Sequence, residues 1–126
     1  MKTSDIENNV DPILKELNEK IASDSKNAEL FRQRAEYYAN HEKLNDALSD
    51  VSKAIEIEPG KPGNFLTASD VYILMGKPQQ ALDAINKAIT LNDTSTVAYL
   101  RKARLYMIMK DYEHCAETVE KVFSLD

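Results

Sequence analysis

Apolar residues recur along most of this chain at steps of three and four, which is the spacing of one face of an α-helix. One such run starts at Phe31 and continues through Ala35 and Tyr38. A polar break at residues 40–43 separates it from a second run, which stops before Pro59 and Gly60. The apolar members of the second run are Leu44, Ala47, Leu48, Val51, Ala54 and Ile55. The pattern predicts two helices joined by a short turn.

The whole pattern returns after 34 residues, and then once more. In the second copy Gly76 and Lys77 break the helices and Pro78 suits a first helical turn, while Lys110 and Asp111 occupy the same place in the third. Seven columns keep their size and polarity: Phe31, Phe65 and Tyr99; Ala35, Ser69 and Ala103; Tyr38, Tyr72 and Tyr106; Ala47, Ala81 and Cys115; Val51, Ile85 and Val119; Ala54, Ala88 and Val122; Ile57, Leu91 and Leu125. Such self-similarity predicts three stacked helical hairpins.

Both ends of the repeat array carry further signals. Asp11 and Pro12 are typical of an N-cap and a first helical turn, and they open an apolar run that predicts a capping helix over 12–23. Residues 1–11 are expected to form a flexible, polar N-terminal segment. At the other end, apolar side chains of the last helix lack a covering element: Val119, Val122, Phe123 and Leu125. Two explanations stay open, a longer protein or self-association with a second copy through Val119, Val122 and Phe123.

A large aromatic residue, a small residue four later and a tyrosine three further on, followed by small and apolar places on the second helix, resemble the tetratricopeptide repeat (TPR). Residues 28–61, AELFRQRAEYYANHEKLNDALSDVSKAIEIEPGK, match most closely and include the repeat-ending Pro59. The second and third copies depart from the pattern at Asp93, Cys115 and Val122. The resemblance implies an all-α, right-handed α-solenoid over 12–126, a superhelix with repeats 28–61, 62–95 and 96–126 and an N-terminal capping helix.

The resemblance also implies that the first helices of the hairpins line a concave, ligand-binding groove. Those places are mostly polar in the first repeat and largely apolar in the next two. The expected groove residues are Arg32, Glu36, Leu66, Asp70, Ile73, Leu100, Arg101, Arg104 and Met107. Such a surface suits a peptide with apolar anchors and an acidic group. The alternatives are that the aliphatic residues complete the packing between repeats and that the arginines pair with Glu36 or Asp70.

Some TPR domains grip the carboxylate-ended tails of heat-shock chaperones with lysines, arginines and asparagines at set places. Here Arg32 and Arg101 fit that pattern in charge. Glu36, Thr67 and Val97 stand where asparagine, asparagine and lysine are expected, and Glu36 would repel a terminal carboxylate. The sequence therefore argues against this partner.

Composition narrows the function classes. The 126 residues carry a net charge of -5 with both signs interspersed, which disfavours nucleic acid. There is one cysteine, so an internal disulfide and a cysteine-based zinc site are excluded. The sequence has no run of 18 apolar residues, which a membrane-spanning helix would need. Its N-terminus also lacks the apolar stretch that is typical of a secretory signal. The segment LNEKIASDSKNAELFRQRAEYY resembles repeats of bacterial envelope lipoproteins as well as cytoplasmic scaffolds, so cytoplasmic and envelope locations both stay open.

Catalysis finds no support in the pattern. His41 and His114 fall in or beside the turns of different repeats, and His114 and Cys115 are adjacent on a helix, so their side chains diverge. Cys115 belongs to a column of small residues expected to be buried. No enzyme activity, cofactor or metal is expected. The sequence predicts a protein-interaction module that binds a peptide or partner protein as part of a larger scaffold, and the alternative is a structural or oligomerisation unit without a peptide ligand.

Overall fold

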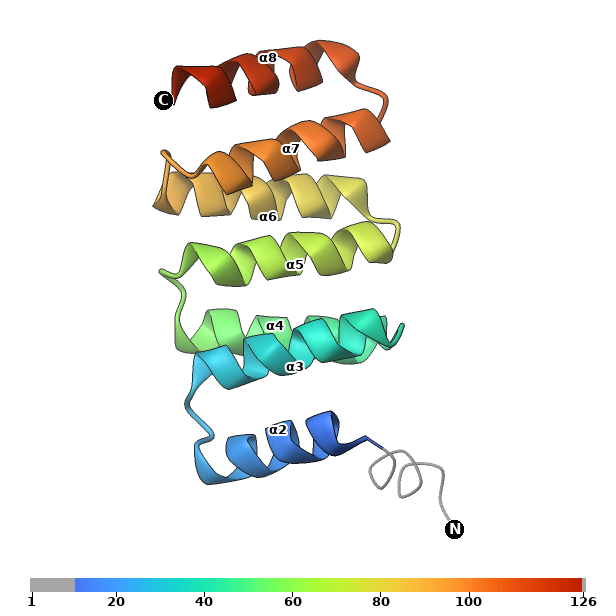
Figure 1. Ribbon diagram of the computed structural model, residues 1–126, viewed down its shortest axis with the longest axis vertical. Helices are drawn as coiled ribbons and strands as arrows, with labels where there is room; N and C mark the ends of the chain where they lie inside the picture. Colours follow the sequence, from blue (N-terminus) through green and yellow to red (C-terminus); the bar gives the residue numbers. More distant parts are fainter. Residues whose placement is uncertain (1–10, 126) are drawn as a thin grey trace. The chain divides into compact units, whose positions relative to one another are not determined.

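The structure is a computed structural model that describes residues 11–125. Across these residues the chain forms seven helices and no strand (Figure 1). The helices are α2 (Pro12–Ser23), α3 (Ala28–Asn40), α4 (Leu44–Ile57), α5 (Pro62–Leu74), α6 (Pro78–Leu91), α7 (Thr96–Ile108) and α8 (Tyr112–Ser124). The all-α helical repeat fold predicted from the period is confirmed. The expected flexible segment 1–11 lies outside the described residues, apart from Asp11.

The chain divides into two compact units, with the boundary between Glu58 and Pro59. The first unit contains α2, α3 and α4, and the second contains α5 to α8. Within each unit, helices that follow one another in the chain pack against one another across short connections (Figure 1). The hydrophobic core of each unit therefore forms between sequence neighbours.

Side chains at the helix starts explain where the helices begin. The first backbone N–H groups of a helix have no partner within it, and a polar side chain just before the helix can accept their hydrogen bonds. The Asp11 carboxylate accepts from the N–H groups of Ile13 and Leu14 at 3.0 and 3.2 Å. The other helices that begin this way are α3, capped by Asn27, α7, capped by Ser95, and α8, capped by Asp111. Proline occupies the first helical position in α2, α5 and α6.

The turn inside each hairpin has one conformation in all three repeats. Glu42, Gly76 and Lys110, which are 34 residues apart, all have positive φ angles, of 60°, 73° and 60°. The N–H of the next residue donates to a tyrosine carbonyl five positions earlier, at Tyr38, Tyr72 and Tyr106. This is the hydrogen bond of a Schellman motif, in which a left-handed residue ends a helix. Each hairpin therefore leaves its first helix in the same direction.

Small residues of the repeat columns are among the most deeply buried of the described residues. In the first column of small residues, Ala35 and Ser69 are fully buried and Ala103 retains 6% of its surface. In three columns of the second helix the first two members are also fully buried: Ala47 and Ala81, Val51 and Ile85, Ala54 and Ala88. A small side chain at these places lets the helix backbones approach, which supports dense packing. In the third repeat the same columns are more open, because Cys115 and Val122 are only half-buried.

Candidate functional site

Exposed aliphatic side chains gather on α7 of the second unit. Five aliphatic residues of α5 and α7 each expose between 48% and 56% of their surface: Leu74, Val97, Leu100, Met107 and Ile108. The four on α7 share one helix face with Arg101 and Arg104, because their positions repeat at steps of three and four. We call this set, together with Leu66, Asp70 and Ile73 of α5, the α5–α7 surface.

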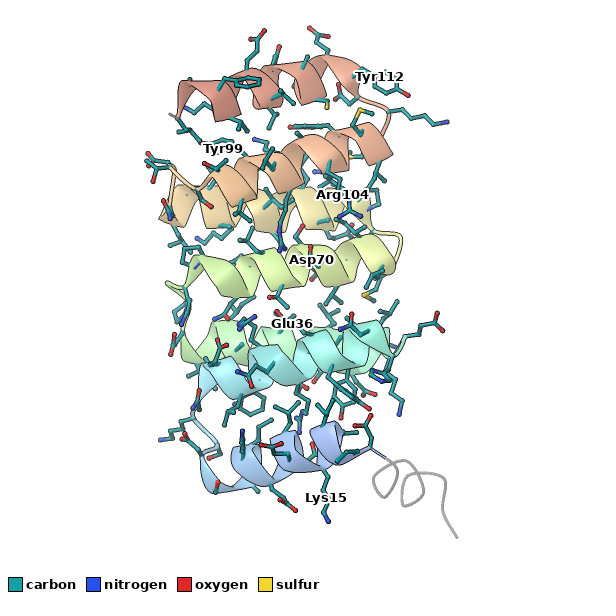
Figure 2. All side chains as sticks on the ribbon, viewed as in Figure 1. Lys15, Glu36, Asp70, Tyr99, Arg104 and Tyr112 are labelled. Atoms are coloured by element: carbon teal, nitrogen blue, oxygen red, sulfur yellow. The ribbon has the colours of Figure 1, made fainter. Side chains whose placement is uncertain are left out.

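A pocket of about 260 Å³ opens on the α5–α7 surface. It is lined by Asp70, Ile73 and Leu74 of α5 and by Arg101 and Arg104 of α7. Figure 2 labels Asp70 and Arg104 on these two helices. Arg101 Nη1 lies 2.5 Å from Asp70 Oδ2 and donates to the Leu66 carbonyl at 3.3 Å, so this arginine joins the two helices. Arg104 forms no ion pair with the residues that the structure describes.

Ile73 contacts both the pocket and the hydrophobic core, and the second contact fits the alternative that the aliphatic residues complete the packing between repeats. It lines the pocket, and it also packs against the core cluster of Ala81, Ile85 and Leu105. Leu66 and Ile73 are half-buried, whereas Leu100 and Met107 expose about half of their surface. Of the four aliphatic residues predicted for the groove, the two on α7 are therefore the more available to a ligand.

Arg32 and Glu36, the other two predicted groove residues, lie on α3 in the first unit. The Arg32 guanidinium pairs with Glu29 one turn earlier and with Glu36 one turn later. Its Nε donates to Glu29 Oε2 at 2.9 Å. Figure 2 labels Glu36 on this helix. The positive charge of Arg32 is thus already balanced by two carboxylates of its own helix, which weakens its attraction for an acidic ligand.

The three residues predicted for self-association lie on α8. Phe123 exposes 72% of its surface and Val119 exposes 37%, while Val122 is half-buried. Exposed apolar side chains that gather on one helix face mark a candidate contact surface.

An ion pair that the sequence pattern did not predict holds the first unit together. Arg34 of α3 donates two hydrogen bonds to Asp50 of α4, from Nε at 2.7 Å and from Nη2 at 2.8 Å. Its Nη1 donates to Asn18 of α2 at 2.9 Å. The guanidinium also lies within 6 Å of the ring centres of Phe31 and Tyr38. One side chain therefore connects all three helices of the unit.

The signal for this pair was the position of Asp50. It follows Ala47 by three and precedes Ala54 by four, so it lies on the apolar face of α4. A carboxylate on such a face is costly unless a cation meets it. The partner could not be identified from the sequence, because Arg34 is 16 residues away and other cations lie nearer.

Two carboxylates that cap helices also bind a ring-bearing side chain: Asp11 binds Tyr37 of α3, and Asp111 binds His114 of its own helix, α8. The Tyr37 hydroxyl donates to Asp11 and holds the pKa of that carboxyl below its usual value. The ring of His41 stacks on Tyr37 with centres 4.0 Å apart. In the second unit the backbone N–H of His114 lowers the pKa of Asp111, and the Asp111 carboxylate, 2.7 Å from Nδ1, raises the pKa of His114.

These groups serve the helix starts. Asp111 receives both the backbone N–H and the ring of His114 in the first turn of α8, which is a capping arrangement. Between Asp11 and Leu125, no three histidine, cysteine or acidic side chains come close enough together to hold a metal ion. Over the same stretch, none of the helices combines the length and the apolar character that a membrane crossing requires.

Comparisons with known proteins agree with this fold. The sequence model of the tetratricopeptide repeat family matches residues 64–95 and 97–126. It does not include 28–61, the segment that the sequence pattern favoured most. No curated protein matches the chain.

Solved structures with the same fold are numerous, and three illustrate the likeness. A crystal structure of MamA is 21% identical with a TM-score of 0.78, over 90% of this chain and 66% of that one. The first TPR of Spaghetti (RPAP3), bound to the HSP90 peptide SRMEEVD, is 22% identical with a TM-score of 0.72, over 79% of each chain. The TPR2B domain of yeast Sti1, in a complex with pHsp70, is 22% identical with a TM-score of 0.73, again over 79% of each chain. This chain spans less than two thirds of the MamA chains, 66% and 61%.

The repeat of 34 residues, the helical hairpins with equivalent turns, the family match and the folds of these relatives lead to one conclusion. The chain belongs to the tetratricopeptide repeat family.

Proposed function

We propose that this chain is a protein-interaction module whose α5–α7 surface binds a peptide, or an exposed segment of a partner protein. The ligand carries aliphatic anchors and an acidic group. The observation that supports the proposal best is the row of half-exposed aliphatic side chains on α7 beside Arg104, an arginine without an ion pair among the described residues. A surface of this kind combines apolar contact with one charge that a ligand can neutralise.

The energetics favour α7 as the binding helix. Burying an aliphatic side chain completely contributes about 1.5–3 kcal/mol, and Leu100 and Met107 still have half of that area to bury. A carboxylate placed on Arg104 would add a charge-assisted hydrogen bond. Arg101 supports the surface differently, because Asp70 and the Leu66 carbonyl already occupy its Nη1 and fix its position.

Two structures with the same fold contain a bound ligand. The Spaghetti domain is seen with an HSP90 peptide and the Sti1 domain with pHsp70. We do not extend the chaperone tail to this chain, because the side chains differ where those tails are gripped. Glu36 is paired with Arg32, the Thr67 hydroxyl donates to the Gly63 carbonyl, and Val97 is apolar. The partner we propose is therefore recognised by internal aliphatic and acidic residues.

The test replaces one aliphatic anchor and the unpaired arginine together, as Leu100→Glu with Arg104→Glu. Proteins retained by immobilised wild type from a native extract would be identified by mass spectrometry, and peptides from them titrated against both proteins by fluorescence anisotropy. The double variant should bind at least about 100-fold more weakly, from the loss of one apolar contact and the reversal of one charge.

A matched control makes the same chemical change in the other unit, as Ile13→Glu with Lys15→Glu. Both residues are exposed on α2, away from the α5–α7 surface in sequence and in unit. Far-UV circular dichroism should give the same helix content for wild type and both variants. Equal peptide affinity for the wild type and the α7 variant would refute the proposed surface, and so would an equal loss in the control.

A further inference from the structure

Helix α8 carries a second apolar stripe, separate from the α5–α7 surface. Tyr112, Val119 and Phe123 expose 61%, 37% and 72% of their surfaces. Together with Ala116 they follow one another at steps of four, three and four, so they lie on one face of the helix. Tyr112 is labelled at the start of α8 in Figure 2. We call these four residues the α8 stripe.

The equivalent positions of α6, in the same unit, show what packs against such a stripe. One repeat earlier, Leu82, Ile85 and Ile89 stand where α8 has Ala116, Val119 and Phe123. Ile85 is fully buried in one core cluster with Leu105 of α7, and Leu82 and Ile89 pack against that cluster. On α6, this face therefore packs against another helix, α7. The α8 stripe presents the same register without an occupant among the described residues.

Charges beside the stripe indicate what kind of helix it would receive. The positions flanking it on α8 hold Glu113, Glu117 and Glu120, where α6 has Gln79, Asp83 and Asn86. These three glutamates form no ion pair with the residues the structure describes. The cation of α8 next to them in sequence, Lys121, lies 5.9 Å from the ring centre of Tyr99. The stripe is thus apolar with an acidic margin.

A second copy of the chain fits this margin poorly. A two-fold symmetric contact brings the same face of both subunits together, so the acidic margins of both copies lie at one interface. The glutamates of the two copies would then approach one another, and like charges across an interface are unfavourable. A basic helix would instead gain attraction from the same carboxylates.

We propose that the α8 stripe is a docking site for an amphipathic helix of a partner protein, with large apolar residues on one face and lysines or arginines beside them. Tyr112, Val119 and Phe123 supply the apolar contact, and Glu113, Glu117 and Glu120 select the sign of the partner's charge. The site is independent of the α5–α7 surface, because it lies on a different helix and prefers the opposite charge.

Two synthetic peptides of about 18 residues, long enough to be helical when bound, provide the probes. Both carry the same leucine stripe, and the polar positions are lysine in one peptide and glutamate in the other. Fluorescence anisotropy with the intact chain should give a dissociation constant at least about tenfold lower for the Leu/Lys peptide, from the sum of several rim charge pairs. Phe123→Glu should weaken that binding by about tenfold or more, since an aromatic anchor is lost.

Charge reversal separates a specific site from general attraction to an acidic protein. Glu117→Lys with Glu120→Lys should transfer the preference to the Leu/Glu peptide. The control Glu16→Lys with Glu19→Lys changes the net charge equally at exposed positions of α2 and should leave the preference unchanged. An equal effect of both reversals, or no binding of the Leu/Lys peptide, would overturn the proposal. So would a concentration-dependent dimer in analytical ultracentrifugation that Phe123→Glu abolishes, because a second copy would then occupy the stripe.

Discussion

Replacing Asp50 by alanine should destabilise the first unit strongly, because the substitution leaves the Arg34 guanidinium without its carboxylate. Asp50 exposes 8% of its side chain and Arg34 exposes 20%. Two hydrogen bonds, of 2.7 and 2.8 Å, join them. In the variant, only Asn18 would still accept a hydrogen bond from this guanidinium. A largely buried charge would remain with one neutral partner and limited access to water.

Breaking a buried ion pair by removing one partner costs about 3–5 kcal/mol. The lower end applies here, because the exposed fifth of Arg34 lets water reach part of the charge. We therefore expect a loss of about 3 kcal/mol in the free energy of unfolding, a large share of the roughly 5–15 kcal/mol typical of a whole domain. Removing both charges, as Arg34→Met with Asp50→Leu, should cost about 1 kcal/mol or less, since no unpaired charge remains and the Asn18 amide that loses its donor is only half-buried.

Urea denaturation followed by circular dichroism at 222 nm measures these differences through the midpoint and slope of the transition. Glu56→Ala is the matched control on the same helix, because Glu56 belongs to an exposed pair with Lys53 at 3.7 Å. It should cost at most about 0.5 kcal/mol. The reasoning is wrong if Asp50→Ala costs no more than Glu56→Ala, or if the double variant is as unstable as the single one.

Three further predictions concern the second unit. Ser69→Ala should raise the free energy of unfolding by about 1 kcal/mol in urea titrations, because the buried Ser69 hydroxyl has no hydrogen-bond partner among the described residues; a loss of stability would mean that it has one. Ile85→Ala should cost about 3 kcal/mol by the same assay and Val119→Ala less than about 1, since the first side chain is fully buried and the second is 37% exposed. Equal losses would contradict these burials. The His114 pair with Asp111 should make thermal stability depend on pH. The raised pKa of His114 stabilises the folded state fully below pH 6.5, and this stabilisation is lost as the pH rises through the pKa of His114 in the folded state. The lowered pKa of Asp111 stabilises the folded state above pH 3.8, and this stabilisation is lost as the pH falls through the pKa of Asp111 in the folded state. His114→Gln should therefore flatten the melting temperature between about pH 5 and pH 8, and an unchanged slope would exclude this pair as its source.

Sequence periodicity was sufficient for the fold because one pattern was repeated. Ala35, Ser69 and Ala103 share size, register and burial, so each copy supports the interpretation of the others. Helix ends could be recognised where a capping side chain or a proline marked them, as Asp11 and Pro12 do for α2. These are local signals, and local chemistry is what a single sequence displays most directly.

The candidate site was harder to predict, because exposure depends on contacts between distant residues. Ile73 and Leu100 are both aliphatic and occupy predicted groove positions, yet the first packs against a core cluster and the second exposes half of its surface. Arg32 and Arg104 are likewise the same residue type, but only Arg32 has carboxylates within reach on its own helix. The first difference does not appear in residue type or spacing, whereas the second does, because Glu29 and Glu36 stand three before and four after Arg32. The burial of Ile73 depends on α6 and α7 residues that only folding brings next to it.

The left-handed residue in the hairpin turns has a consequence for how such a protein can grow. Glutamate, glycine and lysine adopt the same backbone conformation at positions 42, 76 and 110, so no particular side chain is needed there. Glycine is the residue that adopts this conformation most readily, and the other two accept a modest strain in return for the same helix-ending hydrogen bonds. The turn between the two helices is thus determined by the backbone of the hairpin. A gene duplication that copies one hairpin would therefore copy its turn as well. Later substitutions at the left-handed position would leave the angle between the two helices unchanged.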